Sequence, residues 1–330
     1  MPRCATVRVL LDPRIPALVL APMDGVTDAA MRDFQGASGA FTYAVTEFLR
    51  VSSESIPRKV FRREVPELET GGKTSTGMPV QVQILGGDPG RMATSAYTAW
   101  QVGAKAIDIN FGCPAPTVNR HDGGASLLRH PCRIREIVRA VRDAVPNEIP
   151  VSAKLRLGWD SIEPIYENAQ MAVDGGATWI TVHARTRVQG YSPPVYWEPL
   201  RQVRSLVDVP VIANGDIWSL NDFHRCLDET GCQHFMIGRG ALADPMLPHM
   251  IGRELGISSA GIPSVDWATE FCRLVKFIEK HEGGTSGKSL LRLKQWIKIA
   301  HSFGDFERFH ELKVAQSLDE FFDVLARFRP

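Results

Sequence analysis

Cys113 lies in a predicted loop rich in glycine and proline, where a thiol that only packs in a core is not expected. It follows an apolar run in NFGCPAPTVNRHDGGASLL, among glycines and prolines. Because the pKa of a free thiol is about 8.5, such a side chain can donate a proton at neutral pH, and a modest downward shift would make it a nucleophile. A nucleophile needs a base, for which His121 and His183 are the candidates. The residues alone leave both roles open.

Other polar side chains gather at the ends of eight short runs rich in β-branched residues. The runs cover 17–23, 41–48, 79–86, 106–114, 151–158, 179–185, 209–216 and 234–240. Polar residues at or after these runs include Asp24, Glu47, Arg50, Gln83, Asn110, Lys154, Arg156, His183, Arg185, Asn214, Asp216 and Arg239. Each one alone could satisfy its own loop backbone. Together they predict one site at the carboxyl ends of parallel strands.

The spacing of the runs predicts the fold class. Their starts are roughly 30 residues apart, the length of one strand and one helix with their loops. The intervening segments have helical periodicity, as 131–145 does with Ile134, Ile137, Val138 and Val141. We therefore expect an α/β protein with a TIM (β/α)8 barrel, and an open doubly wound sheet is the alternative.

The strand pattern ends after Pro245, and three amphipathic segments follow at 265–282, 288–303 and 307–328. These segments predict a C-terminal α-helical bundle, in which Trp296 packs in the core. Glycine-rich and serine-rich stretches at 256–264 and 283–287 supply a linker and a helix break. We expect an N-terminal extension over 1–16, a barrel over 17–255 and a helical domain over 262–330.

Two loops late in the barrel segment have the composition of a phosphate site. ANGDIWSL and IGRGALADP place glycines beside helix starts, and the loops after strands seven and eight of TIM barrels often hold phosphate. Strand alternation points Lys154 into the barrel with Ser152 and Arg156, where it needs an ion-pair partner, a cofactor or a substrate. Two further glycine patterns are weak: Gly238, Gly240 and Ala243 as a dinucleotide fingerprint, and GGTSGKS as an incomplete P-loop.

Composition is typical of a globular enzyme and conceals two basic segments. The 330 residues are 44% hydrophobic and 23% charged with a net charge of +1, which by itself argues for neither nucleic acid nor membrane. The six cysteines show no metal or disulfide spacing, so we expect a reducing cytoplasm and no metal. No apolar run is long enough to span a membrane. Residues 50–63 are nevertheless basic, as are 283–304, which hold Lys288, Arg292, Lys294 and Lys298 without an acidic residue.

Nine motifs in register make the chain resemble the tRNA-dihydrouridine synthase family. They are LAPMDGVTD, VTEFLRV, VQILGGDP, DINFGCPAPTV, GGASLL, AKLRLGWD, VHARTRVQGY, VIANGDI and MIGRGAL, over about residues 18–245. RLGWDS, VTEFLRV and RLKQWIK look most like the bacterial type C branch, whose target is uridine 16 of the tRNA D-loop. The resemblance implies an enzyme that reduces uridine to 5,6-dihydrouridine with FMN as cofactor and NADPH as hydride donor. We also expect a cytoplasmic monomer.

The resemblance also implies roles for individual residues. Cys113 would be the general acid, protonating C5 after the flavin passes hydride to C6 of the extruded uracil. Asn110 and Arg156 would read the base and its phosphate, with Arg50 nearby. RNA phosphates would contact Lys288, Arg292, Lys294 and Lys298, for which a solvated helix face is the alternative. FMN would be held by Pro22, Met23, Asp24, Gln83, Lys154, His183, Asn214, Gly215, Asp216, Gly238 and Arg239.

Two other functions are compatible with parts of this pattern. A small-molecule flavin oxidoreductase of the dihydroorotate dehydrogenase kind would share the barrel, the flavin and a proton donor, but the basic segments and the helical domain argue against it. A catalytically inactive RNA-binding barrel is disfavoured because Cys113, Lys154 and both phosphate loops are present.

Overall fold

Each of the eight predicted runs contains a strand in the computed structural model, which describes residues 10–120, 122–258, 266–282 and 286–327. One additional two-residue strand, Leu49–Arg50, pairs with the strand Val80–Leu85. The strands are β1 (Ala17–Leu20), β2 (Tyr43–Val45), β3 (Leu49–Arg50), β4 (Val80–Leu85), β5 (Ile107–Asn110), β6 (Val151–Arg156), β7 (Trp179–His183), β8 (Val211–Asn214) and β9 (His234–Ile237).

The strands close into a barrel. Neighbours run in the order β2-β1-β9-β8-β7-β6-β5-β4, all parallel, and a pairing between β2 and β4 completes the ring. The barrel prediction is thus confirmed and the open sheet is wrong. Register places Asn110 beside Lys154 and His183 beside Asn214, so predicted site residues from neighbouring strands meet at one end of the barrel.

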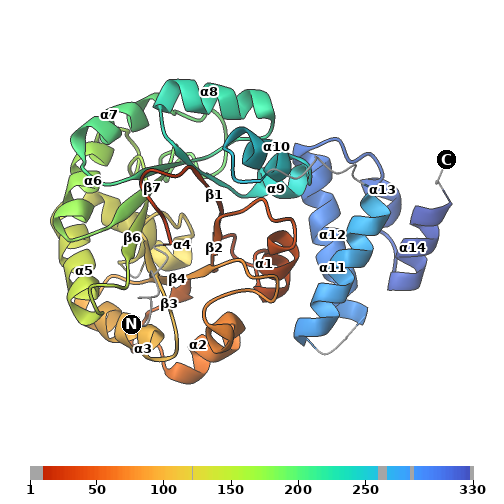
Figure 1. The fold of residues 1–330 in the computed structure, drawn as a ribbon, viewed down its shortest axis with the longest axis horizontal. Helices are drawn as coiled ribbons and strands as arrows, with labels where there is room; N and C mark the ends of the chain where they lie inside the picture. Colours follow the sequence, from red (N-terminus) through yellow and green to blue (C-terminus); the bar gives the residue numbers. More distant parts are fainter. Residues whose placement is uncertain (1–9, 121, 259–265, 283–285, 328–330) are drawn as a thin grey trace, which may run out of the picture.

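Helices surround the barrel, as Figure 1 shows. The longer ones are α1 (Ala29–Gly36), α2 (Arg58–Glu64), α3 (Pro89–Gln101), α5 (Pro131–Ala144), α6 (Pro164–Asp174), α7 (Glu198–Leu206), α8 (Leu220–Thr230) and α10 (Leu247–Glu254). Shorter turns are η1 (Pro66–Thr70), α4 (Pro116–Asn119), η2 (Gly124–Arg129) and α9 (Arg239–Ala243). Asp28, Asp88 and Ser219 begin α1, α3 and α8 by accepting a backbone N–H, as capping residues do.

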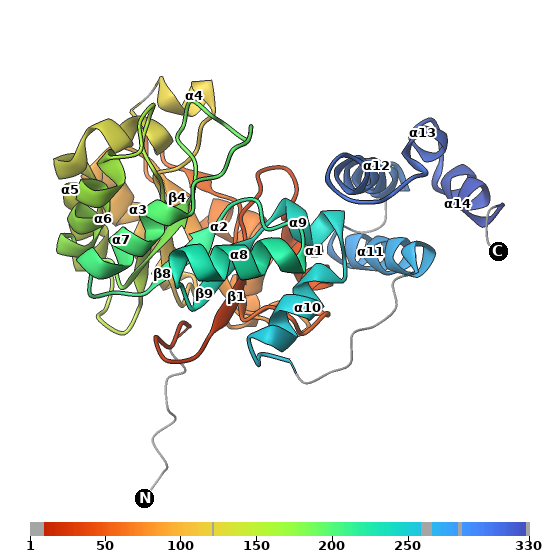
Figure 2. The ribbon, with the colours of Figure 1, turned by 90° about the horizontal axis from the view of Figure 1, so that it is seen from above.

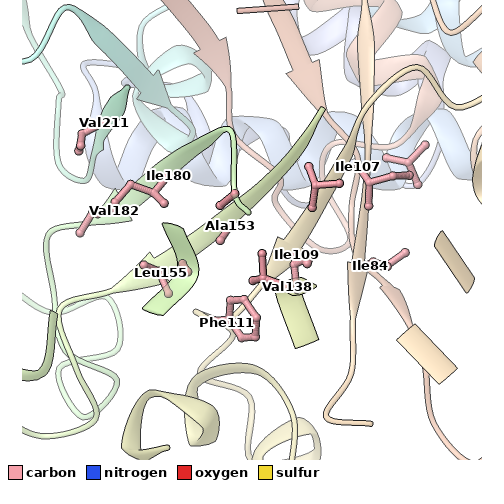
Figure 3. Close-up of a cluster of buried hydrophobic side chains, with 14 of the residues drawn as sticks. Ile84, Ile107, Ile109, Phe111, Val138, Ala153, Leu155, Ile180, Val182 and Val211 are labelled. Carbon is pink, nitrogen blue, oxygen red and sulfur yellow. The ribbon is translucent and has the colours of Figure 1, made fainter. Parts of the chain in front are cut away.

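Strand alternation separates an apolar outer face from a polar interior. Ile107 and Ile109 of β5 are fully buried in the layer between barrel and helices, together with Val138 of α5 (Figure 3). The intervening residues Asp108 and Asn110 face the barrel interior, because successive side chains of a strand point to opposite faces. The apolar layer therefore fixes which polar side chains enter the barrel.

The C-terminal segments form a helical bundle beside one flank of the barrel (Figure 2). It contains α11 (Trp267–Glu282), α12 (Ser286–Phe303), α13 (Phe309–Leu312) and α14 (Leu318–Ala326). The third predicted helix is thus two short ones, because Ser317 accepts the N–H of Glu320 and starts α14 anew. Most of the predicted linker, part of the helix break and residues 1–9 of the extension lie outside the described residues.

The bundle shares a hydrophobic core with the barrel flank. Met31 and Phe34 of α1 and Leu242 of α9 belong to the same buried cluster as Phe271 and Trp296 of the bundle. Trp296 is fully buried, and its indole N–H donates to the Leu242 carbonyl at 2.8 Å, which confirms its predicted place in the core. None of the described helices has the length and apolar character that a membrane span requires.

Candidate functional site

A cavity of about 540 Å³ opens at the carboxyl ends of the strands and gathers most of the predicted site. Its size is in the range of pockets that bind small molecules and cofactors. The predicted residues that line it are Pro22, Met23, Asp24, Gln83, Asn110, Cys113, Lys154, Arg156, His183, Asn214, Gly215, Asp216, Gly238 and Arg239.

Cys113 is 9% exposed and lies at the wall of this cavity. Burial is the largest influence on its thiol and raises its pKa above the ordinary value. A thiol with a raised pKa stays protonated at neutral pH, which favours the proton-donor role over the nucleophile. His121, one of the two candidate bases, lies outside the described residues.

A chain of hydrogen bonds fixes the backbone that carries Cys113. Asn110 Oδ1 accepts the N–H groups of Gly112 and Cys113, each at 2.9 Å. Its amide nitrogen donates to Gln83 Oε1 at 2.8 Å, and Gln83 Nε2 donates to Asp108 at 2.7 Å. A carboxylate only accepts hydrogen bonds, so Asp108 requires the NH2 group of Gln83 to face it, and the Gln83 oxygen then faces the NH2 group of Asn110. The Asn110 oxygen is thereby turned toward the Cys113 loop.

Asp108 is the buried end of that chain. It is 3% exposed and also accepts a hydrogen bond from Ser152 Oγ at 2.5 Å. Burial raises its pKa to about 6, although the hydrogen bonds from Ser152 and Gln83 and the charge of Lys154 act in the opposite direction. The carboxyl therefore titrates close to neutral pH.

Lys154 points into the cavity, as strand alternation predicts, and donates to Asn214 Oδ1 at 3.2 Å. Burial lowers its pKa to about 8, and the nearby charge of Arg156 acts in the same direction. The Asn214 amide donates to the Met236 carbonyl at 2.9 Å, which fixes its oxygen toward the lysine. Lys154 is half-buried and donates its one described hydrogen bond to a neutral amide, so it can also bind an anionic ligand in the cavity.

His183 stays neutral at physiological pH. Burial, followed by the charge of Arg156, lowers its pKa well below the ordinary value. Its ring packs on Gly215, where an added Cβ would lie 2.9 Å from His183 Cδ2 and where φ is +120°. Only glycine allows this close approach of backbone to ring.

Two predicted ligand-binding residues hold loops in place. Arg156 is 2% exposed and donates to the carbonyls of Gly112, Thr186 and Gly190, so its guanidinium is largely committed to backbone. Asp216 forms an ion pair with the fully buried Arg185 and lies 3.6 Å from Arg239. Both line the cavity, but these partners limit what either can offer a ligand.

The four basic residues predicted on the second C-terminal helix meet at a second groove. It has a volume of about 500 Å³, runs between the loop at Gly25 and α12, and is lined by Lys288, Arg292, Lys294 and Lys298. Arg292 does not simply face solvent, because it pairs with Asp28 and donates to the Gly25 carbonyl at 2.5 Å. It joins the bundle to the barrel, whereas Lys298 is exposed.

The first basic segment lies apart from both cavities. Arg50 is exposed and donates to the carbonyl of Thr117 at 3.2 Å, in α4, the short helix that follows Cys113. Arg58 donates to Gln101, and Arg63 pairs with Glu64 on α2. Arg50 is thus close to the site without lining it.

Sequence reasoning missed one residue behind the cavity wall, Asp108, and two that line the cavity, Tyr191 and Ile299. Asp108 follows from alternation, since it lies two positions before Asn110 on the inward face of β5. Tyr191 lies in a quoted motif, and its ring is 5.2 Å from the Arg156 guanidinium. Ile299 of α12 also lines the cavity, and no local pattern in the sequence indicates that.

Comparison with known proteins gives consistent matches along the chain. The sequence profile of a family described as dihydrouridine synthase matches residues 19–308. A tRNA-dihydrouridine(16) synthase of Pseudomonas putida is 46% identical over 285 residues, which cover 86% of this chain and 87% of that protein. One of Shewanella oneidensis is 42% identical over 311 residues, which cover 93% of this chain and 96% of that protein.

Solved structures share the architecture at low sequence identity. An old yellow enzyme homologue from Zymomonas mobilis matches with a TM-score of 0.51 and 14% identity, over 79% of this chain and 96% of that one. Histamine dehydrogenase from Rhizobium sp. 4-9 matches with a TM-score of 0.56 and 14% identity, over 79% of this chain and 49% of that one. At this identity the likeness establishes the barrel fold alone.

Proposed function

Since this chain belongs to the dihydrouridine synthase family, we propose that it reduces uridine 16 in the tRNA D-loop to 5,6-dihydrouridine. The reductant is NADPH and the cofactor is FMN. The observation that carries the proposal is the buried, protonated thiol of Cys113 in one cavity with Lys154 and neutral His183. The free thiols of Cys113, Cys132, Cys226, Cys232 and Cys272 fit a cytoplasmic location. A monomeric state stays a prediction.

The cavity residues fit FMN. The backbone at Gly215 and Gly238 reaches the cavity wall without a side chain, and Arg239 beside them supplies a cation for the phosphate. Lys154 supplies a second, half-buried cation, which stabilises negative charge that accumulates inside the barrel during reduction. When bound, FMN supplies hydride transfer from NADPH to C6 of the uracil.

Cys113 completes the reduction by delivering a proton. As hydride adds to C6, the electron pair of the C5=C6 bond moves to C5, and the proton on Cys113 Sγ transfers there. The thiolate then regains a proton from water. Asn110 holds the loop in position for this transfer through the Cys113 backbone N–H.

The base must leave the folded tRNA to enter a cavity at the barrel end, as bases do in other base-modifying enzymes. The basic groove at α12 supports this substrate, because Lys294 and Lys298 can neutralise RNA phosphates beside the barrel. A small-molecule flavin oxidoreductase has no need of such a groove.

The test uses purified protein, FMN, NADPH and tRNA transcribed without modifications. We expect a yellow protein that converts uridine 16 and no other D-loop uridine, with one NADPH consumed per dihydrouridine. Apoprotein that is assayed without added FMN should not convert uridine. Reduction at another position would overturn the assignment of uridine 16, and oxidation of dihydroorotate without activity on tRNA would favour the small-molecule enzyme.

A further inference from the structure

The cavity that we assign to FMN is not built by the barrel alone. Ile299, near the end of α12, lines it together with Lys154 and Arg239. Figure 1 shows α12 close to α9, the helix that follows β9, and the two helices are in contact. We propose that the helical bundle completes the cofactor site, with Phe303 of α12 and Trp218 holding Arg239 in position for the FMN phosphate. This inference rests on the proposed function, since it requires FMN in the cavity.

Three aromatic rings surround the Arg239 guanidinium. Its central carbon lies 4.5 Å from the centroid of the Phe303 ring, and 5.0 Å from those of Trp218 and Tyr191. These distances are within the range of cation–π attraction. Arg239 is therefore held by rings from the barrel loops and from the bundle at once.

Phe303 and Trp218 form a stacked pair across the boundary between bundle and barrel. Their ring centroids are 4.7 Å apart and their planes differ by 5°. Trp218 follows β8, in one of the two loops predicted to hold phosphate, and Arg239 follows β9 in the other. The pair thus connects α12 with both loops.

The end of α12 is fixed against α9 by backbone contacts. Trp296 donates to the Leu242 carbonyl at 2.8 Å, and a Cβ on Gly304 would lie 2.3 Å from the carbonyl oxygen of Ala243. Only a residue without a side chain allows this approach. The position of Phe303 is therefore set relative to the helix that begins at Arg239.

Folding alone does not account for the place of Phe303. Its side chain is 41% exposed, and it lies outside the hydrophobic cluster that joins bundle and barrel. Its ring instead stacks on Trp218 and lies over the Arg239 guanidinium. Asp216 lies 3.6 Å from the Arg239 guanidinium, which is longer than a hydrogen bond. The N–H groups of Arg239 are therefore available to a second anion.

The experiment measures FMN affinity of the apoprotein by fluorescence titration, for wild type, Phe303→Ala, Phe303→Tyr and Trp218→Ala. We expect Phe303→Ala to weaken FMN binding by about 3- to 30-fold, the range of a cation–π contact, and Phe303→Tyr to retain affinity. Riboflavin, which lacks the phosphate, should bind wild type and Phe303→Ala equally. Val314→Ala is the control, since Val314 is 57% exposed in the same bundle.

A double-mutant cycle tests whether the two rings act together. Combining Phe303→Ala with Trp218→Ala should cost less than the sum of the single losses, because either change breaks the stacked pair. Unchanged FMN affinity in Phe303→Ala, or an equal loss for riboflavin, would overturn the inference. Absence of FMN binding by wild type would instead overturn the proposed function itself.

Discussion

The side-chain oxygen of Asn110 accepts the backbone N–H of Cys113 at 2.9 Å and that of Gly112 at the same distance. One amide on β5 therefore holds the turn that carries the thiol. The amide itself is oriented by Gln83 and, beyond it, by Asp108. The position of the thiol thus depends on a polar chain inside the barrel and not on its own loop alone.

Replacing Asn110 by Ala should leave two buried N–H groups unpaired and loosen the Cys113 loop. We expect kcat for dihydrouridine formation to fall about 10- to 100-fold, because proton transfer needs the thiol within hydrogen-bond reach of C5. The rate at which NADPH reduces the bound flavin should change little. Asn110→Asp keeps the acceptor and loses the donor to Gln83, so it should lie between wild type and Asn110→Ala. Equal kcat in wild type and Asn110→Ala would contradict the positioning role.

Cys113→Ala separates the two half-reactions. Flavin reduction by NADPH should proceed at the wild-type rate, whereas dihydrouridine formation should fall by a factor of about 10² or more, as for loss of a general acid. Cys132→Ala is the matched control, since Cys132 is exposed at the start of α5. Retained dihydrouridine formation in Cys113→Ala would disprove the proton-donor role.

The pH dependence distinguishes an acid from a nucleophile at Cys113. Burial raises the pKa of the thiol, so the protonated form persists throughout neutral pH and is lost only above the raised pKa. A proton donor therefore predicts single-turnover dihydrouridine formation that does not rise with pH between about 6 and 8.5. A nucleophile predicts a rate that increases about tenfold per pH unit in that window.

Much of this site could be predicted from the sequence because it repeats a local rule. Several strands carry polar residues at or near their carboxyl ends, so counting along each strand places Lys154, His183 and Asn214 at one end of the barrel, and barrel closure brings them together. Alternation along the strands also gave the inward direction of Lys154. These features depend on the nearest strand and need no knowledge of distant segments.

The contacts between bundle and barrel could not be predicted in this way. Helical spacing predicts that Arg292 is part of an RNA-facing stripe, but in the structure it pairs with Asp28, which is distant in the sequence. Helical periodicity shows which residues share a face and not which partner covers that face. The stacking of Phe303 on Trp218 depends on the same tertiary docking.

The ionisation of Asp108 should make the stability of the protein depend on pH. Its pKa is raised from 3.8 to about 6, so the fold favours the protonated carboxyl. The contribution of this group to the free energy of unfolding is fully present below pH 3.8 and is lost as the pH rises through about 6. The loss amounts to about 3 kcal/mol. Asp108→Asn cannot ionise, so it should cost more stability at pH 4 than at pH 7, with a difference of about that size.

Urea unfolding of apo wild type and apo Asp108→Asn at the two pH values measures this difference. Asp143→Asn provides a control for general effects of carboxylate removal, since Asp143 lies near the end of α5 and outside the cavity. A cost of Asp108→Asn that is the same at both pH values would mean that the fold does not raise the pKa of this carboxyl.

Arg292 and Lys298 line the same groove, but replacing each by Ala should have different effects on tRNA binding and on stability. Lys298 is exposed, so Lys298→Ala should weaken tRNA binding, reduce the slope of log K against log salt by about 0.7–0.9, and leave the unfolding free energy unchanged. Arg292→Ala removes the pair with Asp28 and the bond to Gly25, so it should also lower the unfolding free energy by about 1–2 kcal/mol.

Lys105→Ala is the matched control for Lys298→Ala, because Lys105 is exposed just before β5, at the barrel end opposite the cavity. Titrations of labelled tRNA at several salt concentrations, with urea unfolding of the same variants, give both quantities. If Lys298→Ala bound tRNA with the affinity and salt slope of Lys105→Ala, the groove would not contact RNA phosphates.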